Sequence, residues 1–398
     1  MPHARKRHAL PLFLKKLHFA RVVTLHGCRQ AGKSFFAREL AAPATRDAKY
    51  LTLDQKSQKE FANDNPETFL QLYKDNRVLF IDEAQKAPPL FDAVKHEVDL
   101  DTRPGQYVLL GSTEFCRETR IRESLTGRVS RLRLYSMNIA ECLNLPPSPA
   151  PSTTLLNEKP RVTRKEIVKH LVQGGFPGIF HLHDEQEREA LLKDWVDITV
   201  LRDLQQFPWL KLDTELAYSA LYALAQLEEP TASEISARTK KDTRAIQKLL
   251  HWLEILFVVH RVEPHPLGTG KPRYYLCDVS LAHQMGASFE RKLETWFLHE
   301  QLSQRAYRKD GETVIQYYRT TKGSVVHFLI STRKEPNLVR AIKIIPTEKL
   351  DLREIAVLEA FRIKGSRAGI RLELFGLGSA HFHLKREKVR IYPWESIG

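Results

Sequence analysis

Three short apolar runs stand out in the first part of the chain, each followed by small or polar residues. They are VVTL at 22–25, VLFI at 78–81 and YVLLG at 107–111. Continuous β-branched and aliphatic runs of this length are typical of strands that are buried on both faces of a parallel sheet. Good helix formers follow the first run, in SFFAREL at 34–40. The pattern predicts an α/β core over residues 1–145.

A glycine-rich segment follows the first predicted strand. HGCRQAGKSF at 26–35 contains the pattern G-x-x-x-x-G-K-[ST] between a strand and a helix, which is the context of a phosphate-binding P-loop. Backbone N–H groups of such a loop turn toward phosphate oxygens. We expect Lys33 to reach the terminal phosphates and the Ser34 hydroxyl to bind Mg²⁺. The predicted ATP-binding residues of the loop are Gly27, Cys28, Arg29, Gln30, Ala31, Gly32, Lys33 and Ser34.

Two carboxylates end the second predicted strand. We expect Asp82 to hold the Mg²⁺ shell and Glu83 to orient and polarise the attacking water, as phosphoryl transfer to water requires. A solvated acidic turn after a buried strand is the alternative. The third strand ends in hydroxyls, of which Ser112, rather than Thr113, is the better candidate to contact the γ-phosphate or the water.

An arginine follows the third strand, in ESLTGR at 123–128. Arg128 could neutralise charge in the transition state on the nucleotide of a neighbouring subunit, which would require a homo-oligomer. The alternative is an ordinary surface arginine. The predicted catalytic residues are Lys33, Glu83, Ser112 and Arg128.

The order of these motifs resembles the P-loop ATPases of the extended AAA+ class (AAA_14) that carry a DUF4143-type C-terminal region. The matching stretches are GCRQAGKS, YLTLD at 50–54, VLFIDEAQKAP at 78–88, YVLLGST at 107–113, ESLTGRV at 123–129, GGFP at 174–177, TVLRDL at 199–204 and KPRYYLCDVSLA at 271–282. The resemblance covers nearly the whole chain. It implies ATP hydrolysis by an AAA+-like core, followed by a helical lid, a winged helix and a restriction-endonuclease-like α/β C-terminal domain.

The segment after the core predicts a linker and then a lid. Residues 146–162 are rich in Pro, Ser and Thr and favour a linker, and residues 163–226 favour a helical lid. The lid contains GGFP at 174–177, which resembles a motif of related ATPases whose proline lies near the adenine. The resemblance therefore adds Pro177 to the expected ATP-binding residues. A simple helix-breaking turn is the alternative.

Residues 227–283 predict a winged helix. Thr231 and Glu234 have the spacing of a capping box, and Asp242 is the candidate N-cap of the next helix. The apolar positions of that helix are Ile246, Leu249, Leu250, Leu253 and Leu256. The residues predicted to contact DNA are Lys240, Lys241, Thr243, Arg244, Gln247 and Lys248. The alternative is a winged helix that serves only as a packing module.

Residues 284–398 predict a helix near 289–302 and strands at 314–318, 325–330 and 338–344. This order resembles the nuclease-like domain of the family, whose second strand normally carries an Asp and whose third carries Glu-x-Lys, for Mg²⁺ and for the attacking water. Here the two carboxylate positions hold His327 and Ala341, and only Lys343 and Glu290 remain. Because Mg²⁺ prefers oxygen ligands, we expect a nuclease fold without nuclease activity.

The chain is basic and long enough for two or three domains. Its 398 residues include 62 Lys and Arg against 48 Asp and Glu, a formal net charge of +14, which favours polyanionic partners. No apolar run approaches the ~18 residues of a membrane span, and the basic start lacks a signal-peptide cleavage site, so we expect a cytoplasmic protein. The four cysteines form no C-x-x-C pair, and neither a zinc site nor a disulfide framework is predicted.

The preferred hypothesis is a Mg²⁺-dependent ATPase that engages nucleic acid, with DNA as the expected form, through its winged helix and basic surfaces. Nucleotide state would then control DNA binding or remodelling. One alternative is a slow regulatory ATPase that acts through protein partners. The other is an active DNA nuclease, which His327 and Ala341 disfavour. The basic residues of the tail are Arg371, Lys385, Arg386, Lys388 and Arg390.

Overall fold

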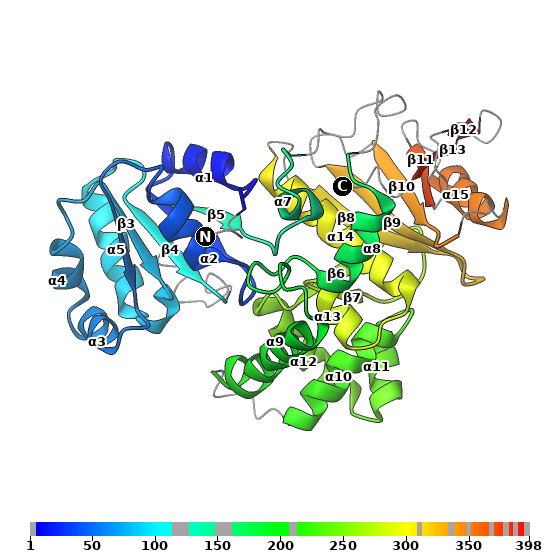
Figure 1. The fold of residues 1–398 in the computed structure, drawn as a ribbon, viewed down its shortest axis with the longest axis horizontal. Coiled ribbons are helices and arrows are strands. Elements are labelled where there is room, and N and C mark those ends of the chain that lie inside the picture. Colours follow the sequence, from blue (N-terminus) through cyan, green and yellow to red (C-terminus); the bar gives the residue numbers. More distant parts are fainter. Residues whose placement is uncertain are drawn as a thin grey trace. The chain divides into compact units, whose positions relative to one another are not determined.

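The chain forms two compact units (Figure 1). The first contains Met1–Met137, Phe176–Gly178 and Ile255–Val258, and the second contains the rest of the chain. The computed structural model describes residues 5–113, 127–147, 161–206, 213–308, 313–332, 338–347, 352–365, 370–376, 382–384 and 389–393. Most of the predicted linker, the ESLT stretch at 123–126 and the tail residues Lys385, Arg386 and Lys388 lie outside these ranges.

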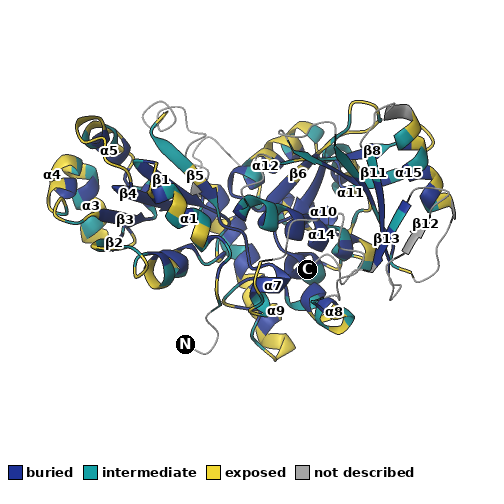
Figure 2. Cartoon of the chain, turned by 90° about the horizontal axis from the view of Figure 1, so that it is seen from above, coloured by how far each residue is buried: buried dark blue, intermediate teal, exposed yellow. Residues whose placement is uncertain are grey.

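A five-stranded parallel sheet forms the centre of the first unit. Its order is β2 (Ala48–Thr52), β3 (Val78–Asp82), β4 (Tyr107–Gly111), β1 (Val22–His26) and β5 (Val129–Arg133). Every position of β1, β3 and β4 is buried, as Figure 2 shows, which explains why their sequences are continuously apolar. The three apolar runs seen in the sequence are therefore the three central strands.

The parallel register brings the carboxyl ends of the three central strands to the same edge of the sheet. His26 at the end of β1 pairs with Gly111 at the end of β4, and β3 pairs in parallel with β4 on its other side. The phosphate loop, Ser112 and the Asp82–Glu83 pair therefore follow their strands at the same edge, where ligands bind in open α/β sheets.

Short helices complete the first unit. They are α1 (Leu10–Leu17), α2 (Lys33–Phe35) with the π-helix η1 (Phe36–Ala41), α3 (Lys56–Asp64), α4 (Pro66–Gln71), the 3-10 helix η2 (Ala84–Lys86) and α5 (Pro89–Leu100). Phe13 of α1 packs edge-on against Phe36, with ring centroids 5.4 Å apart. Leu90 and Val94 of α5 are buried against strand residues such as Ile81. Burial of each such side chain stabilises the unit by about 1.5–3 kcal/mol.

The first part of the second unit is helical. Its elements are α7 (Ile139–Cys142), α8 (Arg164–Gln173), α9 (Glu185–Ile198), η5 (Thr199–Asp203), η6 (Leu204–Gln206), α10 (Thr214–Gln226), α11 (Ala232–Thr239) and α12 (Thr243–Ile255). The predicted N-caps are confirmed, because Thr231 accepts the N–H of Glu234 at 3.3 Å and Asp242 accepts that of Arg244 at 2.9 Å. All five apolar positions predicted for the helix after Asp242 are buried.

An eight-stranded mixed sheet forms the rest of this unit. Its order is β12 (Phe382–Leu384), β13 (Val389–Pro393), β11 (Ile370–Gly376), β10 (Val339–Ile344), β9 (Val325–Thr332), β8 (Thr313–Arg319), β6 (Val259–Pro264) and β7 (Arg273–Leu276). The antiparallel β6–β7 hairpin joins the sheet through parallel pairing of β6 with β8. The helices α13 (Val279–Gln284), α14 (Phe289–Tyr307) and α15 (Leu352–Gly365) accompany it. The predicted α/β character of the C-terminal region is confirmed.

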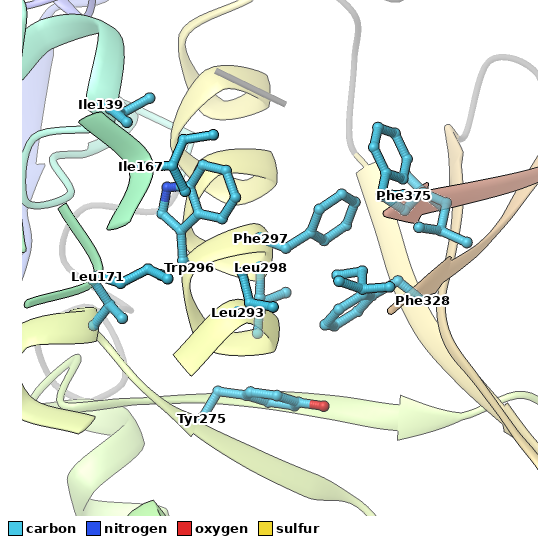
Figure 3. Close-up of a cluster of buried hydrophobic side chains, with 14 of the residues drawn as sticks. Ile139, Ile167, Leu171, Tyr275, Leu293, Trp296, Phe297, Leu298, Phe328 and Phe375 are labelled. Atoms are coloured by element: carbon cyan, nitrogen blue, oxygen red, sulfur yellow. The ribbon is translucent and has the colours of Figure 1, made fainter. Parts of the chain in front are cut away.

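Aromatic side chains of α14 form the core of the second unit (Figure 3). Trp296 and Phe297 are fully buried, and the ring of Phe297 stacks on that of Phe328 with centroids 5.1 Å apart. Phe297 also meets Phe375 of β11 at a centroid distance of 5.6 Å. Because large buried rings contribute most to core stability, α14 is fixed firmly against the sheet.

Candidate nucleotide-binding site

The two glycines of the phosphate loop occupy positions that disfavour a side chain, Gly27 for lack of space and Gly32 because of its positive φ and a tight neighbour. A Cβ at Gly27 would lie 2.1 Å from the carbonyl oxygen of Leu134. Gly32 has a φ of 89°, and a Cβ there would lie 3.1 Å from Cγ of Pro177. The loop therefore turns sharply between β1 and α2, with its backbone close to two neighbouring segments. Of the other predicted loop residues, Cys28 and Ala31 are buried, Arg29 is partly buried and Gln30 is exposed.

Pro177 reaches the phosphate loop from a distant part of the sequence. The tripeptide Phe176–Gly178 belongs by its contacts to the first unit, and Phe176 is fully buried. The sequence placed Pro177 in the site only through a family resemblance. The structure brings it against Gly32, and its position relative to an adenine ring stays a prediction.

Lys33 is almost completely buried, with 6% of its surface exposed. Its Nζ donates to the carbonyl oxygens of Gly27 at 2.8 Å and Cys28 at 2.9 Å. Burial lowers the pKa of Lys33, and the charges of Cys28, Glu83 and Asp82 oppose that shift. The ammonium group is thus held inside the loop and within the electrostatic reach of both carboxylates that follow β3.

The carboxylate of Asp82 has a hydrogen-bond donor on each oxygen. Oδ1 accepts the backbone N–H of Glu83 at 2.9 Å, and Oδ2 accepts the hydroxyl of Tyr50 at 2.6 Å. Tyr50 lies on β2, beside β3, and its hydroxyl also hydrogen-bonds Ser34. Burial, and then the bond to Asp82, raise the pKa of Tyr50, so the phenol stays protonated. The two predicted magnesium ligands, Ser34 and Asp82, therefore share one partner.

Glu83 has an unusual backbone conformation. Its φ of 56° and ψ of 40° lie in the left-handed region, which side chains without special local bonding rarely adopt. The Gln85 amide donates to Oε2 of Glu83 at 2.5 Å and fixes the direction of the carboxylate. Burial raises the pKa of Glu83, and the charge of Lys33 opposes this. Strain of this kind is concentrated at functional sites.

Ser112 and Thr113 directly follow β4, beside the start of the phosphate loop. Nδ1 of His26 donates to the Thr113 carbonyl at 3.3 Å, since a carbonyl oxygen only accepts, and Nε2 accepts from the Thr24 hydroxyl at 2.9 Å. Burial lowers the pKa of His26 to about 3. The neutral ring therefore ties the end of β1 to the end of β4 and positions Ser112. Contact of Ser112 with a phosphate stays a prediction.

Arg7 is a residue of this site that sequence reasoning missed. Its guanidinium is buried and donates to the carbonyl oxygens of Ala31 at 2.9 Å and Tyr135 at 2.6 Å. It therefore joins the phosphate loop to the segment after β5. In the sequence Arg7 is one of several basic residues near the start, and no spacing rule distinguishes it from the others.

Arg128 lies at the amino ends of the strands of the first sheet, whereas the phosphate loop lies at their carboxyl ends. It precedes β5, and its carbonyl accepts the N–H of Val22 at the start of β1. Its guanidinium makes two bonds to Asp99, at 2.5 and 2.8 Å. Because the loop follows the other end of β1, Arg128 does not lie at the loop of its own chain. Its predicted role toward a neighbouring subunit stays a prediction.

The residues predicted to contact DNA fall into two groups. Those with exposed side chains are Lys240, Arg244, Gln247 and Lys248. Lys241 instead pairs with Asp213 at 3.5 Å and Glu215 at 4.0 Å, and the Thr243 hydroxyl donates to Oγ of Ser236 at 2.8 Å. Four of the six predicted side chains are thus on a polar surface at and near the start of α12.

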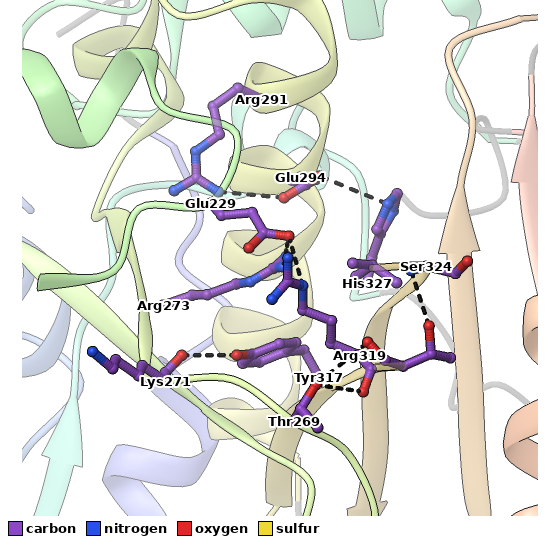
Figure 4. A network of polar contacts seen from close by, with 12 residues as sticks. Glu229, Thr269, Lys271, Arg273, Arg291, Glu294, Tyr317, Arg319, Ser324 and His327 are labelled. Carbon is purple, nitrogen blue, oxygen red and sulfur yellow. Dashed lines mark hydrogen bonds and ion pairs between the residues drawn. The ribbon is translucent and has the colours of Figure 1, made fainter. Parts of the chain in front are cut away.

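The loop of the β6–β7 hairpin, predicted as a wing, packs against β8. A Cβ on Gly270 would lie 2.1 Å from the Tyr317 hydroxyl, which donates to the carbonyl of Lys271 at 2.8 Å. The Thr269 N–H donates to the carbonyl of Arg319 at 2.9 Å. These contacts, seen in Figure 4, favour the packing alternative for this loop.

The residues expected from the nuclease resemblance meet at a cavity of about 610 Å³ in the second unit. Glu290, His327 and Lys343 all line it. Ala341 is fully buried in the hydrophobic cluster that includes α15. Strands are present where the sequence predicted them, at 325–330 and 338–344, and Ala341 belongs to the core.

His327 accepts a hydrogen bond on one ring nitrogen, and its other ring nitrogen faces Glu294 (Figure 4). The Ile344 N–H donates to Nδ1 at 3.1 Å, so Nδ1 is unprotonated, and Nε2 lies 3.8 Å from Glu294. Burial lowers the pKa of His327 well below its ordinary value. The neutral ring therefore turns its Nε2–H toward Glu294, which also pairs with Arg291 at 3.3 Å.

Two further carboxylates of this cavity, Glu229 and Glu354, lie beside basic side chains. Glu229 lies 2.8 Å from Arg273 and 3.2 Å from Arg319, and Figure 4 shows the carboxylate between the two guanidinium groups. Lys343 pairs with Glu354 at 2.9 Å. Three carboxylates of the cavity, Glu229, Glu294 and Glu354, are thus each paired with a basic side chain.

Two family models match parts of the chain. Residues 20–143 match the AAA domain model, and residues 164–292 match a domain of unknown function, DUF8612. The AAA match covers the phosphate loop, both carboxylates of β3 and Ser112, and an AAA domain implies nucleotide binding. The predicted ATPase-type domain is confirmed at this level. The likeness of the C-terminal region to DUF4143 stays a prediction.

Two uncharacterized mycobacterial proteins are among the relatives that match this chain. Uncharacterized protein Rv2008c of Mycobacterium tuberculosis and Uncharacterized protein Mb2031c of Mycobacterium bovis are each 23% identical over 362 residues, covering 85% of this chain and 76% of theirs. Among solved structures, the Aeropyrum pernix ORC1 protein in complex with DNA has a TM-score of 0.29 at 14% identity, covering 71% of this chain and 92% of that one. A likeness this weak carries no argument. Over the part of the chain that the structure describes, no helix is long and apolar enough to cross a membrane.

Proposed function

We propose that the chain is a Mg²⁺-dependent ATPase whose nucleotide state controls binding to DNA. The observation that carries the ATPase proposal is the shared edge of β1, β4 and β3. A loop with two glycines at positions that disfavour a side chain, a buried lysine and an adjacent Asp–Glu pair meet there. This combination supports binding of polyphosphate and attack by water.

The residues present fit a nucleotide with magnesium. Backbone N–H groups of residues 27–34 and Nζ of Lys33 would hold phosphate oxygens, and Ser34 and Asp82 would hold the ion. Among the described residues no group of three His, Cys, Asp or Glu side chains could hold a metal. The ion would therefore depend on phosphate oxygens and water, as Mg²⁺ in ATPase sites normally does. Bound magnesium supplies charge neutralisation at the transferred phosphoryl group.

Glu83 is the proposed base that orients the attacking water. Gln85 fixes its carboxylate, and burial raises its pKa toward the range where a base works best. Ser112 would sense the terminal phosphate from the end of β4. Arg128 would act on a neighbouring subunit, which makes a homo-oligomer part of this proposal.

The exposed face at and near the start of α12 is the proposed DNA contact of a winged helix. Its support is the exposure of Lys240, Arg244, Gln247 and Lys248 together with the net charge of +14. The hairpin loop is held against β8, so groove contact would come from the helix alone.

A protein-directed regulatory ATPase is the second candidate. The packed hairpin loop favours it, because a winged helix that packs at its wing can serve as a structural module. A nuclease is disfavoured, since Nδ1 of His327 already accepts a backbone N–H and Ala341 offers no ligand.

The test is ATP hydrolysis with single-stranded, duplex and branched DNA at two salt concentrations. Lys33→Ala and Glu83→Gln serve as inactive references. Arg244→Ala/Lys248→Ala should weaken DNA stimulation about tenfold and reduce its salt dependence. Lys59→Ala/Lys74→Ala, which removes two exposed lysines of the first unit, is the charge-matched control.

The DNA proposal is supported if one DNA form stimulates ATP hydrolysis and Arg244→Ala/Lys248→Ala loses this stimulation. Hydrolysis that depends on Lys33 but ignores every DNA form points to the protein-directed alternative. Hydrolysis that survives Lys33→Ala contradicts the ATPase proposal itself. Mg²⁺-dependent cleavage of the DNA would restore the nuclease alternative.

A further inference from the structure

Tyr50 connects the two residues that are proposed to hold magnesium. Its hydroxyl donates to Oδ2 of Asp82 at 2.6 Å, a short distance typical of a hydrogen bond to a charged carboxylate. The same hydroxyl accepts a bond from Ser34. The result is a relay from the Ser34 hydroxyl through Tyr50 to Asp82.

The relay leaves the metal-binding lone pairs of both end residues available. Ser34 gives its only proton to Tyr50, so the lone pairs of its oxygen are not needed for a bond within the protein. Oδ2 of Asp82 accepts one bond and retains a second lone pair. A hydroxyl has the proton that a second carboxylate would lack, so Tyr50 can orient Asp82 without adding charge.

The register of the sheet explains why a residue of β2 can do this. β2 is the outer neighbour of β3 in a parallel pair, with Tyr50 opposite Phe80 and Thr52 opposite Asp82. The long phenol therefore spans from β2 to the carboxyl end of β3. Tyr50 is only partly buried.

We propose that Tyr50 is a positioning residue for magnesium, which orients Asp82 and Ser34 from outside the metal shell. This inference rests on the proposed function. Outer-shell partners of metal ligands commonly change metal affinity by about 10–100-fold when they are removed. Tyr50 should therefore set the Mg²⁺ requirement of the site and leave metal-free nucleotide binding unchanged.

The experiment measures binding of a fluorescent N-methylanthraniloyl derivative of ADP to the full chain, in EDTA and across a Mg²⁺ titration. Tyr50→Phe removes only the hydroxyl. We expect unchanged affinity in EDTA and a half-saturating Mg²⁺ concentration on the order of tenfold higher than in wild type. Tyr73→Phe, whose ring packs edge-on against Phe69, is the matched control and should behave as wild type.

A double-mutant cycle with Ser34→Ala sharpens the test. If the relay acts as a unit, Tyr50→Phe should raise the Mg²⁺ requirement less in the Ser34→Ala background than in wild type. A merely structural role would instead change the melting temperature and the affinity in EDTA of Tyr50→Phe.

The outcomes separate this inference from the proposed function. If Lys33→Ala abolishes nucleotide binding but Tyr50→Phe leaves the Mg²⁺ requirement equal to or below that of wild type, only the role of Tyr50 is overturned. If wild type does not bind the nucleotide, or Lys33→Ala binds it as well as wild type, both the proposed function and the inference fail.

Discussion

The edge of the first sheet and the cavity of the second unit contain the same residue types in different electrostatic settings. At the first, Asp82 accepts hydrogen bonds from a hydroxyl and a backbone N–H, which leave its negative charge in place. At the second, Glu229, Glu294 and Glu354 each lie beside a basic side chain. Charges that neutralise one another have little left to attract a metal ion or a phosphate. The comparison teaches that carboxylates indicate phosphoryl chemistry only where their charge is not already paired.

The largest expected effect concerns Glu83. Glu83→Gln removes the proposed base and keeps its shape, so ATP hydrolysis should fall about 10²–10³-fold while nucleotide affinity stays within a few-fold. Phosphate release and binding of a fluorescent ADP derivative measure the two. Glu39→Gln, a change at an exposed glutamate paired with Arg38, should leave both unchanged. An undiminished rate in Glu83→Gln would place the base elsewhere.

The next effect tests the pairing in the second unit. Arg291→Met leaves Glu294 without its cation in a buried setting, and the free energy of unfolding should fall by about 3–5 kcal/mol. The described tryptophans, Trp195, Trp252 and Trp296, belong to the second unit, so urea denaturation followed by tryptophan fluorescence reports on it. Arg238→Met, at an exposed position, should change it by less than about 0.5 kcal/mol. If Arg291→Met lowered the free energy of unfolding only slightly, the stability of the second unit would not depend on this ion pair.

A third effect depends on pH. Burial raises the pKa of Glu300 to about 8 from 4.5, although bonds from the Ile139 N–H and the amide of Gln304 oppose this. The folded protein therefore holds a proton that the unfolded chain releases. The resulting stability is complete below about pH 4.5 and is lost as the pH rises toward 8.

Glu300→Gln should remove this pH dependence and raise the free energy of unfolding at pH 8 by about 2 kcal/mol or more, since each unit of pKa shift corresponds to about 1.4 kcal/mol. Fluorescence-detected denaturation at pH 5 and pH 8 measures it, and Trp296 bonds Glu300 directly at 3.2 Å. Glu359→Gln, on a partly exposed pair, is the control. If the free energy of unfolding changed equally between pH 5 and pH 8 in wild type and in Glu300→Gln, Glu300 would be ionised in the folded protein.

The smallest effect concerns Lys343. Its pair with Glu354 is partly exposed, so Lys343→Met should cost less than about 1 kcal/mol of stability. ATP hydrolysis should not change, because the predicted nuclease lysine has no part in the proposed reaction. If Lys343→Met lost ATP hydrolysis, the cavity of the second unit would contribute to the ATPase reaction, and the two regions would not be functionally separate.

Much of the first site could be predicted because its signals are local. The glycines of the loop, the apolar run before Asp82 and the helix formers after Ser34 are each contiguous in sequence. The same holds for the caps at Thr231 and Asp242, which bond backbone groups two or three residues away. Local backbone geometry and one strand register are enough to specify them.

Residues that act across the fold could not be predicted in this way. Arg7, Tyr50 and His26 each bond a group that lies on a separate strand or loop. No periodicity marks them, because the partner of each is set by strand order and register. The pairing of the cavity charges was equally hidden, since Glu229 and Arg319 are 90 positions apart and meet only in the folded chain.

The sequence by itself determined the α/β character of the chain, the phosphate loop, the Asp82–Glu83 pair and the buried face of α12. These follow from steric and hydrophobic preferences that act over a few residues. Only the tertiary structure decided that Tyr50 contacts both Asp82 and Ser34, and which carboxylates of the second unit lie beside basic side chains. Electrostatic interactions depend on distance in space and on burial, so they are settled only when remote segments have packed together.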